Sequence, residues 1–330
     1  MNWQTTNPTS PNKLNHQQLP AIQLKQSGPR TSARFGRLLV WSLIGLGVVA
    51  MTTVGGNSWR ARAQTNRFVS IGGDDQGGTN DCTTPDQPCA TIQHAIEKSG
   101  SGDLIVVGPG TYVENVSVTV SVTIQGDGSA SSMVDGNAAG PVFTINEGVT
   151  ATLTQLTITN GNAQGSQSQF GGGVQNLLGA NTTIVGCTIN DNDATAGGSG
   201  TFGGGIGNLG TLTVINSTIS GNSAPSGGGI ANGSGGSTAT ATVVNSTIAL
   251  NSATTGGGVD NKDTLNLTNT VIAGSVAGGD CVNSGTLATN LNNLIQDGSC
   301  SPAVSGNPKL GMLQNNGGPT FTHALLTGSP

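Results

Sequence analysis

The sequence contains few charged and few aromatic residues for its length. Charged residues make up 8% and aromatic residues 3% of the 330 positions, whereas 54 positions are glycine. A globular enzyme of this length carries about 25% charged residues and roughly 7% glycine. Intrinsic disorder is also disfavoured, because disordered chains contain few β-branched residues, and here Val, Ile and Thr recur in short runs between Gly, Asn and Ser. This composition predicts many short strands and tight turns.

Basic residues are scarce after residue 63. The first 63 residues contain seven Lys and Arg residues and no acidic residue. The remainder contains all 16 acidic residues and four basic ones (Arg67, Lys98, Lys262 and Lys309), which gives it a net charge of −12. A chain this acidic offers no surface that complements a phosphate backbone, so nucleic acid is excluded as a partner.

Residues 1–63 have the composition of an export segment. A mostly apolar run over residues 38–54 follows Arg34 and Arg37 and precedes the small-x-small sequence of a signal-peptidase site at residues 61–63. We interpret residues 1–63 as an export signal with a long basic n-region or, because 17 apolar residues reach the lower limit for a bilayer span, as a signal-anchor. Either way we expect a secreted or cell-surface protein of a bacterial envelope. Membrane contact is expected only through this segment, if it is uncleaved.

Cysteine usage also favours export. Cys82 lies seven positions before Cys89, and Cys281 lies nineteen before Cys300. These spacings predict two local disulfides in an oxidising compartment. Cys187 stands by itself in a strand-like run and is expected to be a buried free thiol. Neither spacing is that of a Cys-x-x-Cys zinc motif, so no metal ligand is assigned among the cysteines.

The strongest signal is an internal repeat. A triple glycine followed by Val or Ile occurs four times, beginning at Gly171, Gly203, Gly227 and Gly256. Each copy is followed by a Thr-rich alternating run that ends in Thr-Ile or Val-Ile. An earlier copy without the triple glycine ends at Ile158, and from there to Ile272 successive isoleucines of these runs are 31, 30, 29 and 24 residues apart. A period of roughly 20–50 residues indicates a stacked array of units that cannot bury a face singly.

Each repeat is interpreted as one turn of a coil. Thr, Val and Ile suit pleated strands, and alternation in residues 211–219 places Leu212 and Val214 on one inward face. The first glycine of each triple is interpreted as a corner residue. Corner positions are also assigned to the asparagines three residues after the isoleucine, Asn192, Asn222 and Asn251. For these asparagines two interpretations stay open: left-handed corner residues, or a stacked ladder of side-chain amides.

The region before the repeats contains motifs of a known fold. The run from Cys82 to Gly136 contains P-C-A-T-I-Q-H-A-I and G-D-L-I-V-V-G-P-G-T-Y and resembles the opening of right-handed parallel β-helix proteins of the pectin-lyase-like superfamily. The glycine repeats resemble those of polymorphic outer-membrane proteins. The tail, with Gly279-Asp-Cys281 and Asn307 to Pro330, resembles the choice-of-anchor Q segment.

These resemblances imply an all-β chain. They imply a single-stranded right-handed parallel β-helix over residues 64–275, with C-terminal coils and a cap over residues 276–330. A short amphipathic helix at Ile92–Ile96 is expected to cap the open N-terminal end of the coil, as the end of a stacked array requires.

Candidate catalytic groups are few. A lyase of the superfamily would resemble a calcium ion held by carboxylates beside an Arg or Lys base, yet Lys262 is the sole base within the repeats. A glycosidase needs clustered carboxylates. The close cluster in the repeats is Asp191 and Asp193, which are interpreted as solvated turn residues after a strand, and Asp260 and Asp263 follow two coils later. We therefore assign no catalytic, cofactor-binding or metal-binding residue.

No cofactor is expected. The alternative is a structural calcium ion, because Asp74-Asp75 and Asp191–Asp193 offer hard oxygen ligands. The overall prediction is an exported, noncatalytic β-helix surface protein. It would act as an adhesin-like or cell-envelope interaction module whose extracellular glycan or protein ligand is unknown. The alternative is a polysaccharide lyase or glycoside hydrolase of the pectin-lyase-like superfamily.

Overall fold

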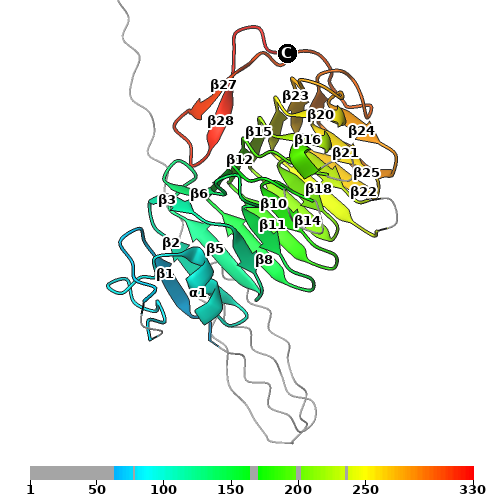
Figure 1. Cartoon of the computed structure of the whole chain (residues 1–330). Helices are drawn as coiled ribbons and strands as arrows, with labels where there is room; N and C mark the ends of the chain where they lie inside the picture. The colour runs from blue at the N-terminus through cyan, green and yellow to red at the C-terminus, as the bar shows by residue number, and fades with distance from the viewer. Residues whose placement is uncertain (1–62, 77–78, 164–169, 198–201, 235–236) are drawn as a thin grey trace, which may run out of the picture. The chain divides into compact units, whose positions relative to one another are not determined.

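The computed structural model describes residues 63–330 except 77–78, 164–169, 198–201 and 235–236. These residues wind into a right-handed parallel β-helix, and each complete coil adds one strand to each of three long parallel sheets (Figure 1). The predicted fold class is therefore confirmed. Of the predicted export segment, residues 1–62 lie outside the described residues. Within the described residues, no helix is long and apolar enough to cross a membrane.

Three parallel sheets run the length of the solenoid. The first contains β1 (Asn66–Val69), β2 (Asp103–Val107), β5 (Val122–Gly126), β8 (Thr150–Thr154), β11 (Asn181–Val185), β14 (Thr211–Ile215), β18 (Thr240–Val244), β22 (Thr264–Thr268) and β25 (Thr286–Leu291). The second contains β3 (Gly110–Val113), β6 (Ser132–Asp135), β9 (Thr157–Thr159), β12 (Thr188–Asn190), β15 (Thr218–Ser220), β19 (Thr247–Ala249), β23 (Val271–Ala273) and β26 (Leu294–Ile295). The third contains β4 (Val116–Val118), β7 (Phe143–Ile145), β10 (Val174–Asn176), β13 (Ile206–Asn208), β17 (Ile230–Asn232), β21 (Val259–Asn261) and β24 (Cys281–Asn283).

The core consists mainly of small aliphatic side chains stacked in register. Along the first sheet Leu153 pairs with Ile184, Ile184 with Val214, and Val214 with Val243, and all four side chains are fully buried. The repeat isoleucines stack in the same way along the second sheet, where Ile189 pairs with Ile219. Because stacked strands lie about 4.8 Å apart, one aliphatic residue per coil fills each column of the bore at close-packed density.

The first glycine of each triple lies at a sharp corner before the third sheet. Its φ is 71° at Gly171, 77° at Gly203, 65° at Gly227 and 61° at Gly256, which is the left-handed region. A Cβ at Gly171 would lie 2.1 Å from the carbonyl oxygen of Val174. Both the backbone conformation and the close approach therefore require glycine here.

The asparagines that follow the second sheet form a ladder. The Asn192 Nδ2 donates to Asn222 Oδ1 at 2.9 Å, and the Asn222 Nδ2 donates to Asn251 Oδ1 at 3.0 Å. The left-handed residue is the one before each asparagine, for example Asp191 with φ of 54°. The amide ladder, rather than the left-handed conformation, describes the contacts of these asparagines.

A second amide ladder, absent from the sequence-based expectations, is formed by the last residues of successive strands of the third sheet. It joins Asn176, Asn208, Asn232, Asn261 and Asn283 through Nδ2-to-Oδ1 hydrogen bonds of 2.6–2.7 Å. The sequence carries a signal for it, because an asparagine stands at the same place after every triple glycine, two residues beyond the Val or Ile.

The N-terminal end of the bore is covered by α1 (Ile92–Lys98), two residues longer than the predicted helix. Its buried face is Ile92, Ala95 and Ile96. The Thr91 hydroxyl accepts a hydrogen bond from the His94 N–H, which satisfies one free amide of the first turn. The two predicted disulfides, Cys82–Cys89 and Cys281–Cys300, are present, and Cys187 is a buried free cysteine.

The C-terminal tail folds back onto the solenoid. After β26 the chain forms an antiparallel hairpin of β27 (Leu310–Asn315) and β28 (Phe321–Leu325), drawn in red in Figure 1. The Pro319 carbonyl accepts hydrogen bonds from the Ser129 N–H and hydroxyl at 2.9 and 3.0 Å. His323 Nε2 lies 2.9 Å from the Ser220 hydroxyl of β15. The hairpin thus lies across several coils of the second sheet.

The remaining described elements are the parallel pair β16 (Ser223–Ser226) and β20 (Ser252–Thr255), and the 3-10 turn η1 (Thr195–Gly197).

Candidate functional site

A cavity of about 470 Å³ lies between the hairpin and the second sheet. The hairpin contributes Met312, Leu313 and Phe321, and the coils contribute Met133, Thr157, Asn190, Asp191, Ser220, Gly221 and Leu250. One wall is therefore apolar and includes an aromatic ring, while the opposite wall carries amide, hydroxyl and carboxylate groups beside the apolar side chains of Met133 and Leu250. A mixed lining of this kind suits a ligand with both apolar faces and hydroxyl groups.

A neighbouring cavity of about 320 Å³ lies at the corner that follows the second sheet. It is lined by Asp135, Asn137, Ala138, Asn160, Gly161, Asn162, Asp191 and Asp193. Asp191 lines both cavities, and we call the two cavities together the Asp191 groove. It combines an apolar wall under the hairpin with an acidic corner.

The register of the coils brings the aspartates together. In the second sheet Asp135 pairs with Thr159, and Thr159 pairs with Asn190. The ends of these three strands consequently meet at one corner, although Asp135 and Asp191 are far apart in the sequence. The parallel register therefore assembles the acidic corner from separate coils.

The carboxylates at this corner are held by short local hydrogen bonds. Asp135 accepts from the Asn160 Nδ2 at 3.0 Å, Asp191 accepts from the Asn190 Nδ2 at 2.6 Å, and Asp193 accepts from the Thr195 N–H at 2.7 Å. Asp191 and Asp193 are exposed and Asp135 is half-buried. The carboxylates are thus oriented yet open to solvent, and they can accept sugar hydroxyl hydrogen bonds or take part in proton transfer.

The other predicted cluster does not join the groove. Asp260 is buried, accepts a hydrogen bond from the Ser226 hydroxyl and pairs with Lys262 at 3.4 Å. The Lys262 ammonium also lies 4.2 Å from the ring centroid of Phe202. Asp263 accepts a hydrogen bond from the Ser237 hydroxyl. These groups stabilise the coils at their own positions.

Asp135 and Phe321 are among the groove residues that the sequence interpretation misses. Asp135 follows Val134, which pairs with the repeat residue Ile158, so its place in the repeat phase was available as a signal. Phe321 carries no such signal, because its position depends on the hairpin folding back to Thr188 and Ser129.

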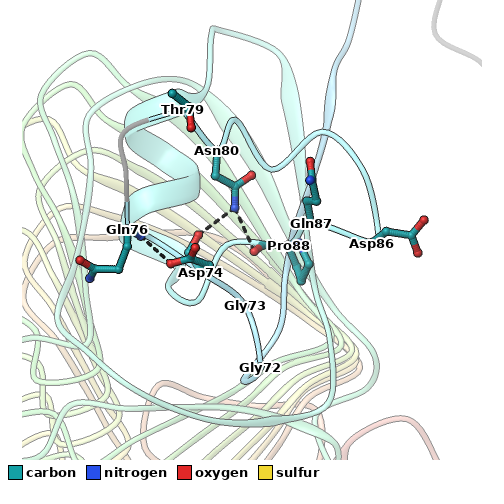
Figure 2. A pocket seen from close by; sticks show the side chains of 9 residues that line it. All are labelled: Gly72, Gly73, Asp74, Gln76, Thr79, Asn80, Asp86, Gln87 and Pro88. Atoms are coloured by element: carbon teal, nitrogen blue, oxygen red, sulfur yellow. Dashed lines mark hydrogen bonds between the residues drawn. The ribbon is translucent and has the colours of Figure 1, made fainter.

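A third cavity of about 310 Å³ lies in the loop beside α1 (Figure 2). Its polar groups stabilise the loop itself. Asp74 Oδ1 accepts from the Gln76 N–H at 2.7 Å, and the Asn80 Nδ2 donates to the carbonyls of Asp74 and Pro88 at 2.8 and 3.1 Å. Asp75, the other half of the proposed calcium pair, accepts from the Ala90 N–H and the Thr91 hydroxyl. Structural calcium stays a prediction.

No family model and no curated protein matches the chain. Among solved structures it is similar to the pectin methylesterase PemA from Erwinia chrysanthemi, with 12% identity, 71% of this chain and 80% of that chain covered, and a TM-score of 0.39. It is also similar to the pectin methylesterase from Aspergillus niger, with 14% identity, 76% and 92% coverage, and a TM-score of 0.40. A pectin methylesterase mutant in complex with a hexasaccharide gives 13% identity, 74% and 82% coverage, and a TM-score of 0.43.

This likeness concerns the fold, and it corrects the functional expectation. The prediction of a noncatalytic, adhesin-like or cell-envelope interaction module is not the one that these comparisons favour, because the three neighbours named above are enzymes by name, at 12–14% identity. The resemblance of the repeats and of the tail to particular surface-protein families stays a prediction.

Proposed function

We propose that the protein is an exported glycoside hydrolase that cleaves a neutral polysaccharide in the Asp191 groove. The observation that carries this proposal is the convergence of Asp135 from one coil and of Asp191 and Asp193 from another on one cavity, beside a second cavity with an aromatic wall. Glycoside hydrolysis needs two carboxyl groups, one to protonate the leaving oxygen and one to activate water or attack the sugar.

The lining supports hydrolysis over elimination. A lyase of this superfamily would use an Arg or Lys base, and no Arg or Lys is among the described residues that line either cavity. Three carboxylates without a nearby cation would also repel a uronate substrate. A polymer of uncharged sugars meets no such repulsion, so its hydroxyl groups can bind the carboxylates and amides while its apolar ring face lies on Phe321.

Export remains part of the proposal. Two disulfides occur in the described residues, which favours an oxidising compartment outside the cytoplasm.

The test is release of reducing ends from a panel of neutral and uronate polysaccharides. We expect cleavage of one or more neutral glycans, and a loss of about 100-fold or more in rate in Asp191→Asn, the size typical of removing a general acid or base. Asp135→Asn and Asp193→Asn identify the second carboxylate. Glu147→Gln, an exposed acidic residue in the turn between β7 and β8, is the matched control and keeps wild-type activity.

The products distinguish the competing chemistries. Unsaturated ends would indicate a lyase, and release of methanol from a methylated uronate would indicate an esterase; either result would overturn the hydrolase proposal. Wild-type rates in all three aspartate variants would remove the Asp191 groove as the active site.

A further inference from the structure

Three potential metal ligands meet at the N-terminal cap, outside the Asp191 groove. The sulfur atoms of Cys82 and Cys89 and a ring nitrogen of His94 all lie within 4.8 Å of one another. The cysteines belong to the loop that precedes α1, and His94 belongs to its first turn. The cysteine spacing gives no indication of this cluster, because the third member comes from a helix that folds back on the loop.

The ligand atoms of this cluster are buried. Cys82 and Cys89 are both fully buried. His94 Nε2 is buried as well, and it has no hydrogen-bond partner among the described residues. An unpaired buried polar atom is unfavourable and requires an explanation, such as an ion or a water molecule at that position. The unpaired nitrogen is therefore an observation independent of the two cysteines.

We propose that, once the Cys82–Cys89 disulfide is reduced, its two sulfurs and the His94 imidazole bind a thiophilic divalent cation such as Zn²⁺. A phosphine reductant breaks the S–S bond, takes up the oxygen of one water molecule and leaves two thiols. Metal binding then releases the two thiol protons to solvent, which gives two thiolate ligands and one imidazole ligand.

The ligand types and their proximity fit this ion. Zinc binds thiolate sulfur at about 2.3 Å and imidazole nitrogen at about 2.0 Å, so its ligand atoms lie within about 4 Å of one another. In the disulfide form the three ligand atoms already lie within 4.8 Å of one another. A water molecule would complete a tetrahedral set.

The site would take over the structural role of the disulfide. In the oxidised chain the disulfide closes the loop whose end leads into α1, and α1 covers the bore. A metal held by Cys82, Cys89 and His94 would tie the same loop directly to α1. The cap would thus stay closed in a reduced chain, before the disulfide forms.

The experiment uses Co²⁺ as a spectroscopic probe on the full chain, with and without a phosphine reductant. We expect one equivalent of Co²⁺ to bind the reduced chain, with a thiolate-to-cobalt charge-transfer band, and Zn²⁺ to displace it. The Cys281→Ser, Cys300→Ser double variant should retain the band, whereas Cys82→Ser should lose it. The oxidised chain should show none.

The histidine is tested separately. His94→Gln should weaken Co²⁺ binding roughly tenfold or more, and His94→Cys should restore it with a stronger charge-transfer band. Unchanged affinity in a folded His94→Gln variant would overturn the proposal and leave a water molecule as the partner of Nε2. A band that depends on Cys281 and Cys300 instead of Cys82 would overturn it too. Neither result bears on the hydrolase activity, which is measured on the oxidised chain.

Discussion

Buried amides hold neighbouring coils together at the scale of single residues. Asn222 lies in the middle of its ladder, where it donates to Asn251 Oδ1 and to the Ile189 carbonyl and accepts from the backbone and side chain of Asn192. Each amide satisfies the next, so the ladder places several polar groups in a dry interior without leaving them unpaired.

Removal of one asparagine from the ladder should therefore lower the free energy of unfolding. We expect Asn222→Leu to lower the free energy of unfolding by about 2–4 kcal/mol, because several buried partners lose their hydrogen bonds while the branched shape of the side chain is kept. Urea unfolding followed by circular dichroism measures this. Asn266→Thr, at a half-buried outward position of β22 between threonine neighbours, is the control and should change stability little. Equal effects in the two variants would contradict the ladder's role.

Glu114, which contacts the first turn of α1, makes the stability of the protein depend on pH. Burial raises the pKa of its carboxyl above the ordinary value, against the lowering effect of hydrogen bonds from the Ile92 and Gln93 N–H groups. A carboxyl with a raised folded-state pKa contributes stability that is complete below its unfolded pKa and is lost as the pH rises through the folded pKa.

Glu114→Gln cannot ionise and should escape this loss. We expect the free energy of unfolding of the variant, relative to wild type, to improve as the pH rises from about 4 to about 7. Chemical denaturation at a series of pH values gives the difference, with Glu147→Gln as the exposed control. Parallel pH profiles for wild type and Glu114→Gln would rule out a raised pKa.

At the scale of elements, the strands and the hairpin differ in how far the sequence predicts them. Alternation places Leu212 and Val214 inward on β14, and both are fully buried. The fold-back of β27 and β28 is not predictable in this way, because it depends on contacts with Ser129 and Ser220, more than one hundred residues away. The Asp191 groove is accordingly half predictable: its acidic corner follows from the repeat phase, and its apolar wall does not.

The hairpin should loosen when its histidine contact is lost. His323 lies between the Ser220 hydroxyl and the Gly311 carbonyl, at 2.9 and 2.7 Å. We expect His323→Ala to raise amide hydrogen exchange in β28 roughly tenfold, the effect of losing about 1–2 kcal/mol of hydrogen bonding, while β15 stays protected. Gln314→Ala, an exposed change in the same hairpin, should leave exchange unaltered. Faster exchange in β15 as well would mean that the hairpin stabilises the solenoid.

The whole molecule depends on an uninterrupted aliphatic interior. We expect Val214→Asp to unfold the solenoid or to lower its free energy of unfolding by about 4 kcal/mol or more, because an unpaired charge would be buried between stacked coils. Thr213→Asp, the preceding residue on β14, is half-buried and directed outward, and it should cost far less. Thermal unfolding of the two variants, followed by β-sheet circular dichroism, makes the comparison. Comparable midpoints would contradict the inward assignment.

The hairpin that lies across the second sheet limits how this molecule can change in length. In-register stacking makes the interior coils nearly interchangeable, so duplication of one coil would lengthen the solenoid without exposing new aliphatic surface. The tail, however, binds Ser129, Thr188 and Ser220 at fixed intervals along the axis. A coil inserted between these residues would move the attachment points of the tail apart. A coil inserted beyond β19 would leave them in place and would lengthen only the path that residues 296–309 must cover. Coils can therefore be added beyond β19 without disturbing the Asp191 groove, whereas coils added between Ser129 and Ser220 would disrupt it.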